Sequence, residues 1–201
     1  MDWVESRLTR AMTVPIDSQS ITQVTLVAVQ SLDGCITRGA EPGVGFASEA
    51  DQAWFRKALK QFDAIVMGRK TYEPVRSHVI RAMEKSSKTL RIVMTRRPTD
   101  WQTDHRPGRL EFDSRPPAEI VSDLTARGCL EIILLGGSTI NRLFLEADLV
   151  DRIWLTLEPE IFGTGRRLVD GPVDGRFRFD GTESLGDSTV LLKYSRQKST
   201  V

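Results

Sequence analysis

Asp51 is the residue of this sequence whose type and neighbours best suit chemistry on a ligand. If residues 48–60 form a helix, Asp51 shares a face with Trp54, Phe55 and Ala58, because side chains three, four and seven positions apart line up on one side. The carboxylate would then border the apolar layer. There it could accept two hydrogen bonds from an amidine-like N–C–NH2 edge and help to place a proton.

The same acid also has a purely structural interpretation. Ser48-x-x-Asp51 fits a capping box, in which an acid three residues after the N-cap residue closes the start of a helix. The pattern alone leaves both the ligand-binding and the capping interpretation of Asp51 open.

A pair of glycines marks a second candidate site. Gly136 and Gly137 end a predicted strand, and Ser138 and Thr139 begin a predicted helix. Free backbone N–H groups and the positive end of the helix would bind an anion there, and the missing side chains would let a pyrophosphate come close. A tight turn capped by Ser or Thr is the alternative. The motif is not a full G-x-G-x-x-G, which disfavours a standard dinucleotide-binding fold.

Gly68, Arg69, Lys70 and Thr71 repeat this order of strand, glycine and helix start. Two cations at the positive end of a helix oppose the helix macrodipole unless an anion joins them. This conflict favours a phosphate ligand, with a solvated basic turn as the alternative.

Thr95, Arg96 and Arg97 follow the next predicted strand. Arginine can bind a phosphate through two parallel hydrogen bonds. A terminal phosphate on a cofactor's ribose would need such a site, which favours NADPH over NADH. Two surface arginines ahead of Pro98 are the alternative.

The remaining motifs argue against other kinds of site. Asp33 and Gly34 could be a plain turn, and His78 and His105 have no partners at metal-ligand spacing. The zinc-deaminase pattern of H-x-E with P-C-x-x-C is absent, and so is the G-x-S-x-G elbow of many hydrolases. We therefore expect no metal site and no hydrolase site.

The composition limits the partners and the compartment. The 201 residues include 28 basic and 27 acidic side chains, a formal net charge of +1, so no strong field attracts nucleic acid or an anionic membrane. Two distant cysteines suit a reducing cytoplasm, and no apolar run is long enough to span a membrane. We expect a cytoplasmic protein in which residues 1–20 are an N-terminal extension that helps to form a homodimer. Residues 21–201 should form a single domain.

Strands and helices must alternate along the chain to position these residues. Runs rich in β-branched and apolar residues predict strands, and apolar residues at helical spacing predict the helices between them. This order predicts a three-layer α/β fold with a mostly parallel central sheet and an antiparallel C-terminal hairpin. The predicted strands lie within residues 21–30, 63–67, 89–95, 109–112, 131–135, 151–162, 176–183 and 188–195.

Ligands of such sheets bind outside the carboxyl ends of the strands. The loops at residues 31–34, 68–71, 95–97 and 136–139 each follow a predicted strand. We therefore expect these four loops to converge on one edge of the sheet.

Several segments, in this order and at these intervals, resemble a known superfamily. ADQAWFRKAL, IVMGRKTYE, LLGGSTI and IWLTLEPEIFG resemble dihydrofolate reductase. SLDG, FDAIVMGRKT and ILLGGSTINRLFLEADLVDRIWLTLEPEIFGTGRRL are still more similar to the reductase domain of the bifunctional riboflavin-biosynthesis deaminase–reductase, which belongs to the same superfamily. The resemblance covers Ile21 to Tyr194 and implies a dihydrofolate reductase-like fold with NADPH as the cofactor.

The resemblance also implies roles for single residues. Asp51 matches the substrate-binding acid of dihydrofolate reductase, and Thr156 matches the threonine that supports this acid. Asp33 matches the acid of the S-L-D-G segment in the riboflavin reductases, which makes it a second catalytic candidate. The cofactor-binding segments of the superfamily match residues 68–71, 95–97 and 136–139.

The sequence departs from both patterns in places. Cys35 stands where riboflavin reductases often have a basic residue, YEPVRSHVI stands in place of their D-D-P-x-L stretch, and SLDG replaces the Pro-Trp element of dihydrofolate reductase. We expect an NADPH-dependent reductase of 5-amino-6-(5-phosphoribosylamino)uracil or a related pyrimidine, with no nucleic acid or membrane partner. The alternatives are a dihydrofolate reductase acting on a pterin and a non-catalytic NADPH-binding protein of the same fold.

Overall fold

A computed structural model describes residues 21–84, 89–186 and 188–197 of the chain. The predicted N-terminal extension, residues 1–20, lies outside the described residues, so the division of the chain at residue 20 stays a prediction. The strands are β1 (Gln23–Ser31), β2 (Ala64–Gly68), β3 (Leu90–Met94), β4 (Leu110–Asp113), β5 (Glu131–Leu134), β6 (Arg152–Glu158), β7 (Phe177–Ser184) and β8 (Val190–Arg196).

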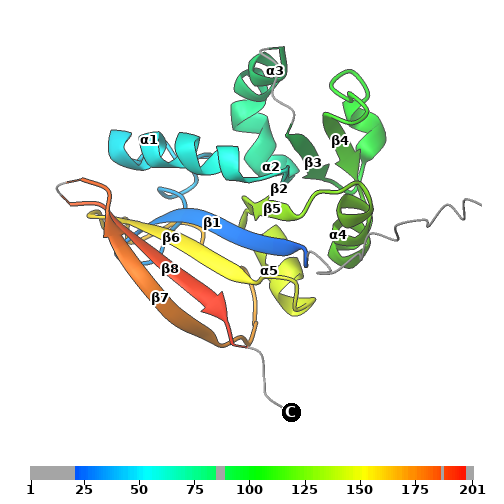
Figure 1. Cartoon of the computed structure of the whole chain (residues 1–201). Coiled ribbons are helices and arrows are strands. Elements are labelled where there is room, and N and C mark those ends of the chain that lie inside the picture. Colours follow the sequence, from blue (N-terminus) through cyan, green and yellow to red (C-terminus); the bar gives the residue numbers. More distant parts are fainter. Residues whose placement is uncertain (1–20, 85–88, 187, 198–201) are drawn as a thin grey trace, which may run out of the picture.

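These strands form one eight-stranded sheet in the order β4-β3-β2-β5-β1-β6-β8-β7 (Figure 1). From β4 to β6 in this order, every pair of neighbouring strands is parallel. Strand β8 runs antiparallel to β6, and β7 runs antiparallel to β8. The mostly parallel sheet and the antiparallel C-terminal hairpin predicted from the sequence are therefore confirmed.

The helices cover both faces of the sheet (Figure 1). They are α1 (Glu49–Ala58), α2 (Arg69–Tyr72), α3 (Arg76–Glu84), α4 (Pro117–Ala126) and α5 (Ser138–Glu146). Helices α4 and α5 pack on one face, and side chains of α1, α2 and α3 pack on the other. The three layers are those predicted. None of the helices in the described part of the chain is long and apolar enough to cross a membrane.

The central strands are apolar on both faces because helices cover both. In β1, Val24 and Leu26 belong to the core under α4 and α5, whereas Val27 belongs to the core under α1. In β6, Trp154 packs against Trp54 of α1 with ring centroids 6.1 Å apart. Side chains two positions apart on a strand share a face. The side chains at positions 29 and 31 of β1 and at positions 156 and 158 of β6 therefore also lie on the face covered by α1.

A proline inside a helical pattern predicts a stop near Pro74, but the helical segment after β2 continues past this residue. A short 3-10 turn, Glu73–Val75, follows α2, and α3 begins directly after it. Pro74 stands in the first turn of this 3-10 segment, where a proline costs little because the missing N–H would have no helical partner. The proline therefore divides the helical segment without ending it.

A buried polar contact fixes α2 and α3 to the loop before β4. The Tyr72 hydroxyl donates to Asp104 Oδ2 over 2.8 Å, and Arg76 donates to both oxygens of the same carboxylate. Asp104 is only 4% exposed, and Trp101 packs edge-on against Tyr72. The hydrogen bonds from Arg76 hold the pKa of Asp104 below its usual value.

Replacing this acid should cost stability in a pH-dependent way. Because the pKa of Asp104 is lower in the folded protein, its contribution is present above the pKa of the unfolded chain and is lost as the pH falls. We expect Asp104→Asn to lower the free energy of unfolding by about 1–2 kcal/mol at neutral pH, since it weakens charge-assisted hydrogen bonds to a half-exposed arginine. Urea unfolding at neutral and acid pH measures this, and a deficit that stays equal at both would contradict it.

Candidate functional site

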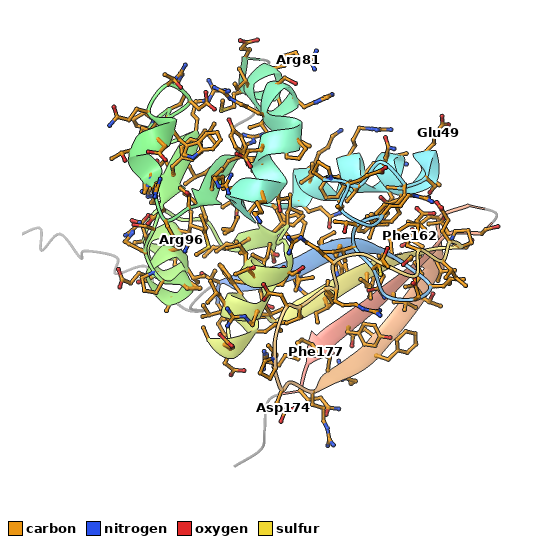
Figure 2. The ribbon with its side chains drawn as sticks, turned by 180° about the vertical axis from the view of Figure 1, so that it is seen from behind. Glu49, Arg81, Arg96, Phe162, Asp174 and Phe177 are labelled. Carbon is orange, nitrogen blue, oxygen red and sulfur yellow. The ribbon has the colours of Figure 1, made fainter. Side chains whose placement is uncertain are left out.

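The carboxyl ends of five parallel neighbours lie along one edge of the sheet, in the order β3, β2, β5, β1 and β6. The four loops predicted to converge there all leave from this edge. In Figure 2, Arg96 after β3 lies at one side of the molecule and Phe162 after β6 at the other, so this edge runs across the whole structure. We call it the ligand edge.

Gly68 at the end of β2 and Gly136 after β5 lie against each other at the centre of the ligand edge. The Gly68 N–H donates to the Gly136 carbonyl, and the peptide bond between Gly136 and Gly137 is cis. A Cβ on Gly68 would lie 2.8 Å from Ile140 Cγ1, so a side chain does not fit. A Cβ on Gly137 would lie 3.5 Å from Thr71 Oγ1. The two predicted glycine turns therefore form one joint surface of backbone, made by Gly68, Gly136 and Gly137, which we call the glycine surface.

The alternative reading of Gly136–Thr139 as a turn capped by Ser or Thr does not describe the structure. The N-cap of α5 is Gly137, and no side chain caps this helix. The Ser138 hydroxyl donates instead to the Arg167 carbonyl over 2.6 Å, and the Thr139 hydroxyl donates to Asp170. The first turn of α5 thus keeps backbone N–H groups without a side-chain cap, which is what an anion at a helix start requires.

The cations at the start of α2 oppose the helix macrodipole less than the sequence alone indicates. Helix α2 is a single turn, and Arg69 forms an ion pair with Glu73 at 2.6 Å. The pair already neutralises one of the two cations, so less positive charge is left to oppose the macrodipole. Lys70 is exposed. The role of Arg69 and Lys70 in cofactor binding stays a prediction.

The loop after β3 presents its arginines to solvent. Arg96 and Arg97 are exposed, and Figure 2 shows Arg96 at the outer surface. The Arg97 N–H donates to Thr95 Oγ1 over 3.3 Å, which shapes the turn. Met94, the last residue of β3, pairs in register with Gly68 of β2. The loop therefore adjoins the glycine surface, and both of its arginines are exposed.

Asp51 lies in the first turn of α1 and is only 7% exposed. Its own N–H donates to the N-cap residue, Ser48 Oγ, over 3.2 Å. The other half of a capping box is missing, because the Ser48 N–H donates over 2.9 Å to Oε1 of Glu158, at the end of β6. Ser48 therefore caps α1, but the Asp51 carboxylate does not close the helix start. This result removes the capping interpretation that the sequence left open.

The surroundings of Asp51 favour its protonated form. Burial raises the pKa of the carboxyl, the nearby Thr156 hydroxyl lowers it, and the charge of Glu158 raises it again. Thr156 is fully buried, and its Oγ1 forms no hydrogen bond of normal geometry in the described residues. The hydroxyl thus lies near the carboxylate without being tied to it. The two residues matched to the substrate site come together, although 105 positions separate them in the sequence.

Asp33, the second catalytic candidate, is tied to the loop after β6. Its carboxylate accepts the Ser31 hydroxyl and the backbone N–H groups of Phe162 and Gly163, the last over 2.8 Å. The hydrogen bond from Ser31 contributes most to lowering the pKa of Asp33 to about 2. The acid stays ionised at neutral pH and joins two loops. Its catalytic role stays a prediction.

Glu158 is the residue of this site that the sequence reasoning missed. It is 2% exposed and lies two positions after Thr156 on the same strand. That spacing places both side chains on the face that packs on α1. An acid in alternation with Thr156 could have been noticed in the sequence, but nothing there shows that it accepts the N–H of Ser48.

No metal site was expected from the sequence. In residues 21–84, 89–186 and 188–197, no three His, Cys, Asp or Glu side chains come together as they would around a metal ion.

Comparison with known proteins gives both a family and a fold. A family model described as the RibD C-terminal domain matches residues 22–191. A search of curated proteins found no match to this sequence. Among solved structures, a protein of Shewanella sp. PV-4, described as a candidate riboflavin biosynthesis protein, is 22% identical with a TM-score of 0.66. That alignment covers 88% of this chain and 100% of the other.

Two further structures extend this comparison. A pyrimidine reductase-like protein of Corynebacterium diphtheriae is 16% identical with a TM-score of 0.67, over 89% of this chain and 93% of the other. A diaminohydroxyphosphoribosylaminopyrimidine deaminase/5-amino-6-(5-phosphoribosylamino)uracil reductase of Thermotoga maritima is 15% identical with a TM-score of 0.71. The match covers 89% of this chain but 57% of that longer one. At these identities the structures confirm the fold.

Proposed function

Since the chain belongs to the family of the RibD C-terminal domain, we propose that it is an NADPH-dependent reductase of the riboflavin-biosynthesis type. Its proposed substrate is 5-amino-6-(5-phosphoribosylamino)uracil or a related pyrimidine. The observation that carries the proposal is the state of Asp51: a carboxylate buried at the ligand edge and released from helix capping because Glu158 takes the N–H of Ser48. A buried acid that has a raised pKa and does not cap its helix is typical of a catalytic site.

The geometry of the glycine surface supports a dinucleotide. Gly68 has no room for a side chain, and the uncapped start of α5 offers backbone N–H groups beside it. Such a surface suits a pyrophosphate, which needs close approach of the backbone and a positive helix end. When bound, the reduced nicotinamide supplies the hydride, and the protein contributes binding and orientation.

Asp51 and Thr156 would then act on the substrate. The carboxylate would accept hydrogen bonds from the N–C–NH2 edge of the pyrimidine, and in its protonated form it would hold the proton that the reduction consumes. The Thr156 hydroxyl, buried without a normal hydrogen bond, would orient the carboxyl group. Asp33 would support the site indirectly by holding the loop around Phe162 and Gly163.

Oxidation of NADPH, followed by its absorbance, tests the proposal. The purified protein is mixed with NADPH and either 5-amino-6-(5-phosphoribosylamino)uracil or dihydrofolate. Oxidation with the pyrimidine supports the proposal, whereas oxidation with dihydrofolate alone favours a pterin reductase. Binding of NADPH without oxidation of either mixture favours a non-catalytic NADPH-binding protein. The expected homodimer is a separate prediction that light scattering measures.

The preference for NADPH over NADH is proposed to depend on Arg96. We expect Arg96→Ala to weaken NADPH binding by about 10- to 100-fold, which corresponds to the loss of one charge-assisted hydrogen bond to phosphate. Binding of NADH should stay unchanged, since that cofactor lacks the phosphate. Fluorescence titration of both cofactors measures the difference.

Arg81→Ala is the matched control for this prediction. Arg81 is an exposed arginine on α3 whose Nε donates to the Ser77 carbonyl. Its replacement should change neither affinity. An equal loss of NADPH and NADH binding in Arg96→Ala would show that Arg96 does not bind the ribose phosphate.

A further inference from the structure

Glu158 carries a buried charge that the proposed reaction does not use. Both carboxylate oxygens accept hydrogen bonds from neutral donors: Oε1 from the Ser48 N–H and Oε2 from the Thr189 hydroxyl, each over 2.9 Å. Burying an acid among neutral donors costs free energy compared with an apolar residue at the same place. A role at the neighbouring site would account for its presence.

The hydrogen bonds around Glu158 have a defined direction. A carboxylate only accepts, so the single proton of the Thr189 hydroxyl points to Glu158. In the contact of 3.1 Å between Ser48 Oγ and Thr189 Oγ1, Ser48 must therefore be the donor. The Ser48 oxygen is then free to accept the N–H of Asp51. These contacts link the end of β6 and the residue before β8 to the first turn of α1.

Glu158 also acts on Asp51 through its charge. The two acids come from different elements. Burial is the main cause of the raised pKa of Asp51, and the charge of Glu158 raises it further. Two charged groups of neighbouring elements have other partners. Asp33 of the loop after β1 is bonded to Phe162 and Gly163, and Lys193 of β8 pairs with Glu183.

We propose that Glu158 is a positioning residue for Asp51: by accepting the N–H of Ser48 it holds the start of α1, leaves the Asp51 carboxylate free for substrate and places a second negative charge near it. This inference rests on the proposed function for its catalytic consequence. Its physical basis, the coupling of two buried acids, can be measured without substrate.

Glu158→Gln separates the charge from the hydrogen bonds. The amide oxygen can accept the Ser48 N–H while the NH2 group donates to Thr189 Oγ1. The Thr189 hydroxyl then donates to Ser48 Oγ. The two hydroxyl hydrogen bonds thus reverse their donor and acceptor, and every contact is kept. The variant should therefore keep the position of α1 and lose only the negative charge.

The titration of the Asp51 carboxyl carbon by NMR is the first measurement. Removing a neighbouring negative charge stabilises the ionised form of Asp51, so its midpoint in Glu158→Gln should move to lower pH than in the wild type. Glu160→Gln is the control, because Glu160 is a surface acid paired with Arg38. The midpoint of Asp51 in this variant should match that in the wild type. An unchanged midpoint in Glu158→Gln overturns the electrostatic part of the proposal.

The pH profile of turnover tests the same idea in catalysis. If protonated Asp51 supplies the proton, turnover declines as the pH rises through its midpoint. That decline should begin at lower pH in Glu158→Gln, in step with the NMR midpoint. A protein without activity would sink the proposed function but leave the NMR result standing, so the two failures can be told apart.

Glu158→Ala tests whether the acid holds the start of α1. This variant leaves the Ser48 N–H and the Thr189 hydroxyl without their acceptor, so its thermal midpoint should fall clearly below that of the wild type. Glu158→Gln should restore most of the loss. Equal thermal midpoints for all three proteins would overturn the holding role.

Discussion

Asp51→Asn should lower turnover by about 10²- to 10⁴-fold, the usual contribution of a positioned acid or base, while NADPH affinity stays unchanged. The same substitution should make the protein more stable at neutral pH. The carboxyl group is buried and close to Glu158, so its ionisation opposes folding. An asparagine has nearly the same shape and no charge to bury. We therefore expect the free energy of unfolding to rise by about 0.5–2 kcal/mol, the range typical of a single stabilising substitution.

The pH dependence of this gain follows from the sign of the pKa shift. A carboxyl whose pKa is higher in the folded state binds its proton more tightly there, so the wild type loses stability as the pH rises from the unfolded pKa through the folded one. Asp51→Asn lacks this loss. The difference in the free energy of unfolding should therefore be small at acid pH and fully developed above the folded pKa of Asp51.

Glu49→Gln is the matched control for Asp51→Asn. Glu49 is also an acid in the first turn of α1, but it is exposed and points outward in Figure 2. It should change turnover and stability little. Urea unfolding at several pH values and NADPH oxidation with the pyrimidine give both readouts. Full turnover in Asp51→Asn would leave Asp51 without a role in the reaction.

Gly136→Ala should cause the largest loss of stability. Gly136 has a φ of +71°, a left-handed conformation that costs an L-residue about 1–2 kcal/mol. An added Cβ would also lie 2.7 Å from Oδ1 of Asn141, whose Nδ2 donates to the Leu168 carbonyl. Overpacking of this kind costs about 1–3 kcal/mol. We expect a total loss of about 2–5 kcal/mol and a clear weakening of NADPH binding, because the glycine surface is displaced.

Gly128→Ala separates the two causes of this loss. Gly128 also has a left-handed φ, +81°, but nothing lies within 4 Å of its added Cβ. It should show only the cost of the backbone conformation and normal NADPH binding. Urea unfolding and cofactor titration of both variants measure the difference. If Gly136→Ala loses no more than Gly128→Ala, Asn141 moves aside freely and the packing argument fails.

The sequence by itself determined the order of the elements and the kind of sheet. Strands such as β1 and β2 are apolar on both faces, which is typical of parallel strands covered by helices on two sides. Strand-to-helix turns need glycine where backbones come close, so Gly68 and Gly136 were visible as candidates before their contact was known. These signals are local, because they depend on neighbours along the chain.

Only the tertiary structure decided what the polar side chains do. Whether Asp51 closes a helix or stays free depends on Glu158, which takes the N–H of Ser48 from 110 positions away. Whether Asp33 is a turn residue or a bridge depends on Phe162 and Gly163, 129 and 130 positions away. A carboxylate takes its role from the donors that the fold brings to it. Those donors lie in loops that adjoin neighbouring strands of the sheet, at positions distant in the sequence.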